Sequence, residues 1–289
     1  MNKLPISVCV ISGAEARRIG LALASVAEWT SEIIVVLNQE VSDGTDQIAA
    51  SYGARVFRES WKGHIAQKNS ALEKAAQPWI LGLDADEAVS GELRDEILAL
   101  PDSWSGRAAY SCPRRTFFMG RWIGHGDWYP DRCARLWQRG KARWTGIDPH
   151  DCLRVDGPTG KLRRDLLHYS NADISSYVRK INYFADLYLQ RQLAEKARWS
   201  APAAIFRAQW RFVRAYFLRL GFLDGYPGFF IAASTAYSTL VRHSRLFEQS
   251  QPGPPSQVIQ IPSAHSADAA LPAPGANAAT PPCAPPKSR

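Results

Sequence analysis

The chain has 289 residues, of which 46% are hydrophobic and 21% charged, a composition that places it among globular proteins with one substantial core or two smaller ones. Five cysteines without a C-x-x-C spacing argue against a zinc site. The net charge of +8 is uneven, because residues 1–100 hold 9 Lys and Arg against 14 Asp and Glu, whereas residues 179–245 hold 11 against 3. The basic C-terminal half therefore favours an anionic partner, either a membrane or a nucleic acid.

The first 100 residues alternate between apolar, β-branched runs and segments with helical spacing of apolar side chains. The expected strands cover 6–11, 33–37, 54–57 and 80–83, and the expected helices cover 16–28, 42–52 and 64–76. Alternating elements of this length predict an α/β fold with a parallel or mixed sheet and helices on both faces. We assign residues 1–105 to a nucleotide-binding half-domain.

Two carboxylates follow the fourth of these strands. The apolar run stops at Asp84-Ala85-Asp86-Glu87, and Ser90 suits the N-cap of the next helix. Ligands of open α/β sheets bind outside the carboxyl ends of the strands. Asp84 and Asp86 could there hold one divalent cation, directly or through water, that bridges a diphosphate. The same D-x-D spacing also occurs in solvated turns, so the wider pattern has to decide between the two.

Residues 107–145 place four tryptophans among nine Lys and Arg. Core packing is one interpretation, and stacking of an aromatic face such as Trp128 on a sugar ring is the other. We assign residues 106–172 to the second half of the same domain.

Helical periodicity returns over 174–193 and becomes strongly amphipathic over 202–220. In the second segment aromatic residues are interleaved with arginines, namely Arg207, Arg211, Arg214 and Arg219. Such a helix either lies in a bilayer interface or packs on the catalytic domain with its arginines in water. We expect residues 173–250 to form a helical, membrane-interface region.

Residues 221–228 are rich in glycine and should interrupt that helix, and the apolar run 229–241 is too short to span a bilayer. The run therefore suits a re-entrant or interfacial segment. Residues 251–289 contain ten prolines and should be a disordered tail. With neither a signal-peptide pattern nor 18 uninterrupted apolar residues, we expect a cytoplasmic protein that is peripheral on the inner face of the cytoplasmic membrane.

In this order, the motifs resemble those of glycosyltransferase family 2, and more closely its lipopolysaccharide-core β-glucosyltransferase-like branch. The resemblance covers roughly residues 5–247. The residues that show it are Ser42-Asp43-Gly44-Thr45, Trp61-Lys62-Gly63, Gln67-Lys68-Asn69, Asp84-Ala85-Asp86-Glu87, Trp128-Tyr129-Pro130-Asp131, Arg135-Leu136, His150-Asp151, His168-Tyr169 and Gly221-Phe222-Leu223-Asp224-Gly225.

This resemblance implies a GT-A fold, a nucleotide-sugar donor that is most simply a UDP-sugar, a divalent metal ion (Mg²⁺ or Mn²⁺) and inversion at the anomeric carbon. It places the metal at Asp84 and Asp86. The implied donor-binding residues are Glu15, Asn38, Asp43, Lys68, Asn69 and Asp84, and the implied acceptor-binding residues are Trp128, Asp131, Arg135 and His150. The acceptor is expected to be a lipid-linked or lipopolysaccharide-core glycan at a membrane surface.

An inverting transfer needs one carboxylate that accepts the proton of the acceptor hydroxyl. The favoured base is Asp151, because His150-Asp151 matches a family His-Glu pair with the acid one methylene shorter. Asp148 and Glu87 are the rival candidates.

The chain departs from the family at two donor-side positions. Ala14-Glu15-Ala16 replaces a common Asn-Glu-Glu, and Asn38 replaces an Asp that binds the nucleobase. Asn can still donate to and accept from a uracil edge. These departures motivate an alternative function as a non-catalytic nucleotide-sugar-binding or membrane-surface scaffold, which the intact D-x-D and His150-Asp151 argue against. We expect no nucleic-acid partner, because no recognisable reading module is present.

Overall fold

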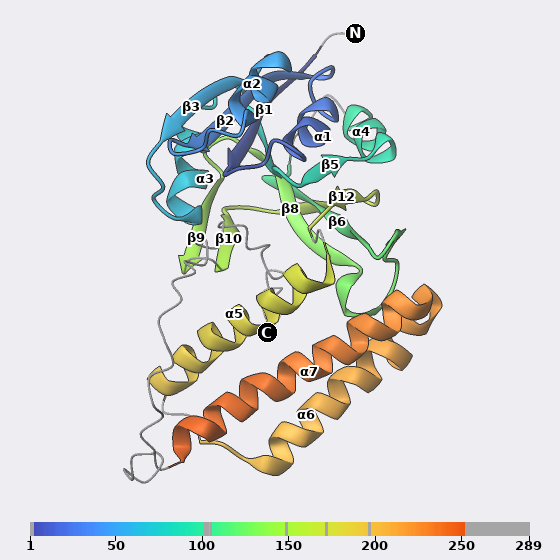
Figure 1. Ribbon diagram of the computed structural model, residues 1–289. Coiled ribbons are helices and arrows are strands. Elements are labelled where there is room, and N and C mark those ends of the chain that lie inside the picture. The colour runs from blue at the N-terminus through green and yellow to red at the C-terminus, as the bar shows by residue number, and fades with distance from the viewer. Residues whose placement is uncertain are drawn as a thin grey trace.

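A computed structural model of the chain describes residues 3–100, 104, 106–147, 150–170, 173–195 and 198–251. Its N-terminal half is the predicted alternation of strands and helices (Figure 1). Four parallel strands lie side by side in the order β3-β2-β1-β4. They are β1 (Leu4–Ser12), β2 (Thr30–Asn38), β3 (Arg55–Glu59) and β4 (Trp79–Asp84). The predicted strands are confirmed, each lengthened by one to four residues.

The sheet continues beyond β4 as a mixed sheet in the order β8-β6-β12-β5, with β8 antiparallel to β4. These strands are β5 (Glu87–Val89), β6 (Ala109–Phe118), β8 (Asp131–Gln138) and β12 (Leu166–His168), with the short β7 (Arg121–Trp122) and β11 (Thr159–Lys161) on β6. In the pairing of β12 with β5, His168 lies opposite Glu87. A histidine that is 81 residues away from Glu87 in sequence therefore lies beside the D-x-D turn.

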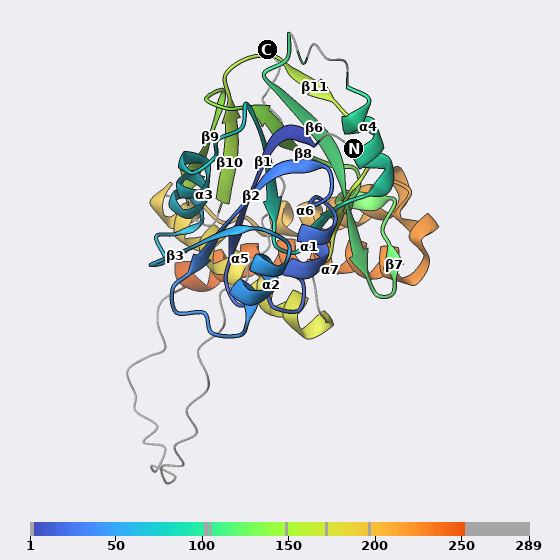
Figure 2. The same ribbon diagram turned by 90° about the horizontal axis from the view of Figure 1, so that it is seen from above.

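Helices and a hairpin cover the two faces of the sheet (Figure 2). One face packs on α1 (Ile19–Ala24), α2 (Thr45–Ser51) and α4 (Gly91–Leu98), and the other on α3 (His64–Glu73) and the hairpin of β9 (Ala142–Ile147) with β10 (His150–Val155). The helix expected over 16–28 is much shorter, because the chain makes turns on both sides of α1. Ser90 caps α4 as predicted, accepting a hydrogen bond from the Leu93 amide at 3.1 Å.

Three C-terminal helices form a separate layer below the sheet, with α7 between α5 and α6 (Figure 1). They are α5 (Ile174–Ala194), α6 (Ala201–Val213) and α7 (Gly225–Ser250), and the π-helical turn η2 (Arg214–Leu218) and the 3-10 turn η3 (Gly221–Asp224) join the last two. The expectation of a re-entrant segment over 229–241 is wrong, since this run is the middle of one continuous helix. Within the described ranges, no helix has the length and apolarity needed to cross a membrane. Of the predicted tail, 252–289 lie outside the described residues.

Asp224 fastens the helical layer to the sheet domain. Its side chain is 2% exposed and accepts hydrogen bonds from the backbone amides of Gly124 and His125 at 2.8–3.2 Å. Arg121 donates to the Asp224 carbonyl at 2.9 Å. The Gly-Phe-Leu-Asp-Gly motif therefore serves as a connection between the two parts of the molecule, because its buried acid satisfies amides of the opposite part.

Candidate active site

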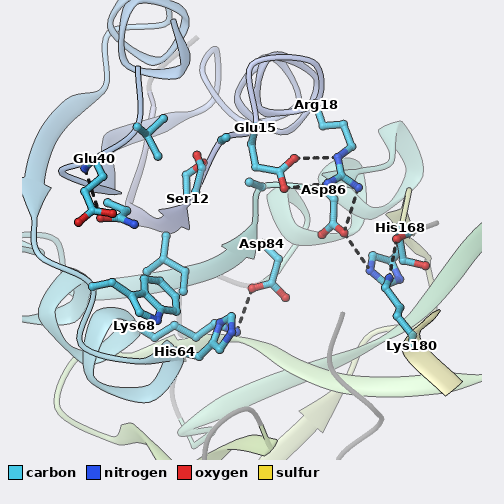
Figure 3. A pocket seen from close by; sticks show the side chains of 18 residues that line it. Ser12, Glu15, Arg18, Glu40, His64, Lys68, Asp84, Asp86, His168 and Lys180 are labelled. Atoms are coloured by element: carbon cyan, nitrogen blue, oxygen red, sulfur yellow. Dashed lines mark hydrogen bonds and ion pairs between the residues drawn. The ribbon is translucent and has the colours of Figure 1, made fainter. Parts of the chain in front are cut away.

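A cavity of about 390 Å³ lies at the carboxyl ends of β1, β2 and β4 (Figure 3). Its lining includes the loop after β1, Asn38 at the end of β2, the D-x-D turn after β4, and residues from α3, β12 and α5. The sheet places these side chains here because parallel strands present their carboxyl ends at one edge. The position predicted from the sequence for the D-x-D is therefore confirmed.

Asp84, the first acid of the D-x-D, is held by two cations. Lys68 Nζ lies 2.9 Å from Oδ1, and Arg135 Nη2 lies 2.7 Å from Oδ2. Burial alone would raise the pKa of Asp84, but Arg135 and Lys68 hold that pKa well below its usual range. Both carboxylate oxygens are therefore occupied, and Asp84 suits an electrostatic role better than direct metal ligation.

Lys68 joins Asp84 to Asp151. Its Nζ lies 2.7 Å from Asp151 Oδ2, and the Asp151 side chain is 3% exposed. Burial alone would lower the pKa of Lys68, but Asp84 and Asp151 outweigh it and raise that pKa. The cation of Lys68 thus places the candidate base, Asp151, next to the D-x-D.

A series of ion pairs, in which acidic and basic side chains alternate, extends from Asp84 away from the cavity. Arg135 also lies 2.5 Å from Glu87 Oε1, and Arg114 contacts Glu87 at 3.1 Å. Arg114 in turn lies 2.6 Å from Asp131 Oδ2. Glu87 is fully buried and also accepts a hydrogen bond from the Asp84 amide at 3.2 Å. Glu87, one of the rival candidates for the base, therefore stabilises the D-x-D turn through these contacts.

Asp86, the second acid of the D-x-D, faces His168 from β12. Asp86 Oδ2 lies 3.6 Å from His168 Nε2 and 3.8 Å from an Arg18 nitrogen. Burial would raise the pKa of Asp86, but His168 and Arg18 lower it. A fourth side chain, Lys180 of α5, lines the same cavity, and burial lowers its pKa. Figure 3 shows these side chains around one part of the cavity.

The described residues provide only part of the ligand set that a metal ion needs. No group of three or more metal-ligating side chains occurs within the described ranges. Asp86 and His168, however, are separated by about one ligand-to-ligand distance, and a hard divalent cation commonly keeps several waters and binds substrate phosphates. Among the residues that line the cavity, Asp86 and His168 are thus the pair that could hold a metal ion jointly with a diphosphate.

The predicted donor-binding residues divide into two groups. Glu15, Asn38, Lys68 and Asp84 line the cavity. Asp43 instead accepts hydrogen bonds from Ala16 and Thr45, and Asn69 exchanges two hydrogen bonds with the Trp144 backbone. Asp43 and Asn69 thus shape the loop after β1 and hold the hairpin, and the structure does not place them in the cavity.

The predicted acceptor-binding residues are also divided. Asp131 and Arg135 belong to the buried ion pairs, whereas the ring of Trp128 packs on Phe118 and Tyr177 at 5.1 and 5.4 Å. Asp148 and the side chain of His150 lie outside the described residues.

Sequence analysis assigned no role to Arg18, His168 or Lys180. Arg18 lies next to Arg17, and His168 belongs to the motif His168-Tyr169, so the sequence contained a signal for both as site residues. Lys180 had no such signal, because only the packing of α5 beside β12 places it here: it donates to the Ser170 carbonyl at 2.9 Å.

Comparison with known proteins supplies the family. The model of "Glycosyl transferase family 2" matches residues 7–154. A glycosyltransferase of Rickettsia prowazekii is 30% identical over 256 residues, which cover 83% of this chain and 86% of that protein. The lipopolysaccharide core biosynthesis glycosyltransferase LpsC of Rhizobium meliloti is 28% identical over 257 residues, covering 86% of this chain and 93% of LpsC. A mannosyltransferase structure from Pyrobaculum calidifontis, in complex with GDP-Man and Mn²⁺, covers 87% of this chain and 89% of its own at 13% identity and a TM-score of 0.49.

Proposed function

Since the chain belongs to glycosyltransferase family 2 and has the mixed-sheet GT-A fold, we propose that it is an inverting, metal-dependent enzyme that uses a nucleotide-sugar donor. The observation that supports this most strongly is the cavity at the strand ends, where Asp86 and His168 face each other beside the cations of Lys68, Arg18 and Lys180. A diphosphate needs such cationic neighbours, because negative charge develops on it as the sugar leaves. A UDP-sugar is the donor we expect.

The residues have distinct proposed roles. Asp86 and His168 would hold the metal ion, which would supply Lewis-acid stabilisation of negative charge on the diphosphate. Lys180 and Arg18 add positive charge on the same side of the cavity. Trp61, which is 40% exposed, and Asn38 line the cavity and are suited to a nucleobase, by stacking and by hydrogen bonds respectively.

We further propose Asp151 as the base. A base must come within hydrogen-bonding reach of the acceptor hydroxyl, although such contacts are often incomplete without substrate. Asp151 and Asp84 share Lys68, so movement of Lys68 toward the donor phosphates would free Asp151 for the acceptor.

The proposed acceptor is a lipid-linked or lipopolysaccharide-core glycan at the cytoplasmic face of a membrane. The likeness to LpsC over most of both chains supports this choice. A second support comes from α6 and the following turn η2, where Phe206, Trp210 and Phe217 are 66%, 46% and 53% exposed. They follow one another at helical spacing and form an apolar stripe along the helix, as in helices that lie in a bilayer interface.

The experiment that tests the enzyme is a screen of UDP-, GDP- and dTDP-sugars for Mn²⁺-dependent binding and hydrolysis by purified protein. We expect one donor to bind with metal, and Asp86→Ala to abolish the metal-dependent part. The matched control is Asp95→Ala, because Asp95 is a 64% exposed carboxylate on α4. Metal-independent binding without turnover would instead support the scaffold alternative, and unchanged metal dependence in Asp86→Ala would contradict the proposed metal site.

A further inference from the structure

Three arginines converge on one carboxylate where the helical layer meets the sheet domain. Asp127 lies in the 3-10 turn η1 (Gly126–Trp128), and its side chain is 9% exposed. The facing guanidinium nitrogens, at 3.3, 3.4 and 3.5 Å, belong to Arg211, Arg214 and Arg219. Charge-assisted N–H···O bonds are about 2.7–2.9 Å long. The carboxylate therefore attracts three guanidinium groups without closing a tight pair with any of them.

The cluster has a surplus of positive charge and of hydrogen-bond donors. Three positive charges face one negative charge, and each guanidinium has five N–H donors. The arginine side chains remain 40%, 31% and 44% exposed, so unused donors are accessible from solvent. The surplus is two positive charges, so a further anion would reduce it and a doubly charged phosphoryl group would balance it.

A fourth arginine, Arg242 of α7, increases the surplus. Its Nε is buried and has no hydrogen-bond partner among the residues that the structure describes. Burial and the positive charge of Arg211 both lower the pKa of Arg242. Buried N–H donors and neighbouring like charges are unfavourable unless an acceptor is added.

The cluster is close in the chain to the apolar stripe and is linked by contacts to the cavity at the strand ends. Arg211 of α6 and Arg214 of η2 lie in the chain between Phe206 and Phe217 of the stripe. Trp128, the neighbour of Asp127, packs on Tyr177 of α5, and Lys180, one turn further along α5, lines the cavity. An amphiphile that contacts the stripe could therefore bring its headgroup to the arginines.

We propose that Arg211, Arg214 and Arg219 form a binding site for the phosphoryl headgroup of an anionic membrane lipid, a class that includes a lipid-linked acceptor. Phosphate oxygens match the planar fork of arginine and supply the missing negative charge. That the lipid is also the acceptor rests on the proposed function, whereas the site itself does not.

The decisive variant is Asp127→Asn, because the site and a purely structural role predict opposite results. If the arginines bind phosphate, Asp127 competes with the ligand, and its neutralisation should tighten binding to phosphatidylcholine vesicles that contain phosphatidic acid. Single Arg211→Gln, Arg214→Gln and Arg219→Gln variants should each weaken it about fivefold, the scale of one basic residue at an anionic surface. The control is Arg191→Gln on α5, whose side chain is 75% exposed and paired with Glu195, and we expect no change.

The source of the phosphate is tested by two further probes. Vesicles of phosphatidylcholine alone should bind weakly, and inorganic pyrophosphate should compete poorly if the headgroup must be membrane-bound. Strong competition would support the phosphate site but assign it to a soluble phosphate. Weaker binding by Asp127→Asn, or unchanged binding by all three Arg→Gln variants with wild-type thermal stability, would overturn the site. Sugar transfer is measured separately, so vesicle binding without any transfer would refute the proposed function and leave the site standing.

Discussion

At the residue scale, the two acids of the D-x-D have different partners, since Asp84 is paired with two cations and Asp86 faces His168. Asp84 could be placed at a strand end from the apolar run before it. Its two cationic partners, Lys68 and Arg135, come from elements 16 and 51 residues away. Pairwise spacing within a motif contains no information about such partners, because they depend on which strands become neighbours. The structure thus separates Asp84, which is paired, from Asp86, which faces a histidine.

The assignment of Asp151 as the base can be tested by a single substitution. Asp151→Asn keeps size and hydrogen bonding but cannot accept a proton, so it should lower transfer by about 10²–10⁴-fold with donor binding nearly unchanged. Rates with saturating donor and acceptor measure the first effect, and titration of the donor measures the second. The matched control is Asp46→Asn, because Asp46 on α2 is also paired with an arginine, Arg58, but is not part of the cavity lining. If Asp148→Asn is inactive and Asp151→Asn is not, the base lies three residues upstream.

At the element scale, the α/β alternation was predictable because strands and helices there have clean periodicities. The C-terminal helices were harder. The interruption expected over 221–228 is confirmed, since η2 ends at Leu218 and η3 precedes the new helix α7. Gly225, Pro227 and Gly228 themselves occupy the first turn of α7, where missing or unpaired amides are tolerated. Gly228 is also required for close approach, since a Cβ there would lie 1.9 Å from the Gly221 carbonyl oxygen. The glycines therefore mark a tight contact between η3 and α7.

The position of α3, which holds Lys68, depends on Glu59 at the end of β3. Glu59 pairs with Lys74 at 2.6 Å and Lys62 at 2.9 Å and accepts a hydrogen bond from Ser70. The pKa of Glu59 is lowered from its usual value of 4.5 to about 2, and the largest cause is the hydrogen bond from Lys74. A depressed pKa means that its contribution to stability is present above about pH 4.5 and is lost as the pH falls from 4.5 toward 2.

Glu59→Gln should therefore flatten part of the acid dependence of stability. We expect the variant to be less stable than the wild type at pH 6 and the difference to shrink as the pH falls below 4.5, as measured by urea unfolding. Glu73→Gln is the control, because Glu73 is an exposed carboxylate on α3, the helix that Glu59 contacts. A constant difference at all pH values would mean that the carboxylate charge of Glu59 is not the cause.

At the scale of the whole molecule, the uneven charge of the sequence corresponds to two structural parts. The acidic residues 1–100 form β1 to β5 of the sheet and much of the cavity at the strand ends, and the basic residues 179–245 belong to the helical layer, which Asp224 connects to the sheet domain (Figure 1). Sequence alone left open whether the amphipathic helix of 202–220 packs or faces a membrane. It does pack, on α7, but Ala204 and Ala215 are among the buried positions, and the large aromatics of the stripe remain exposed. Hydrophobicity and periodicity could not distinguish which side would be covered.

The exposed stripe leads to a last prediction, about membrane association of the full chain. Basic residues near an anionic leaflet contribute about 1 kcal/mol each and are screened by salt, whereas inserted aromatic side chains are not. Wild-type protein should therefore sediment with anionic vesicles and be only partly released by high salt. Replacing Phe206, Trp210 and Phe217 together by Ser should remove the salt-resistant fraction and keep the salt-sensitive one. The control makes the same replacement at Tyr183 and Leu193 of α5, which are 44% and 50% exposed. It should leave both the salt-resistant and the salt-sensitive fraction intact. Wild-type protein that stays wholly in the supernatant would exclude an interfacial role for the stripe, since its exposure alone does not hold the enzyme at a membrane.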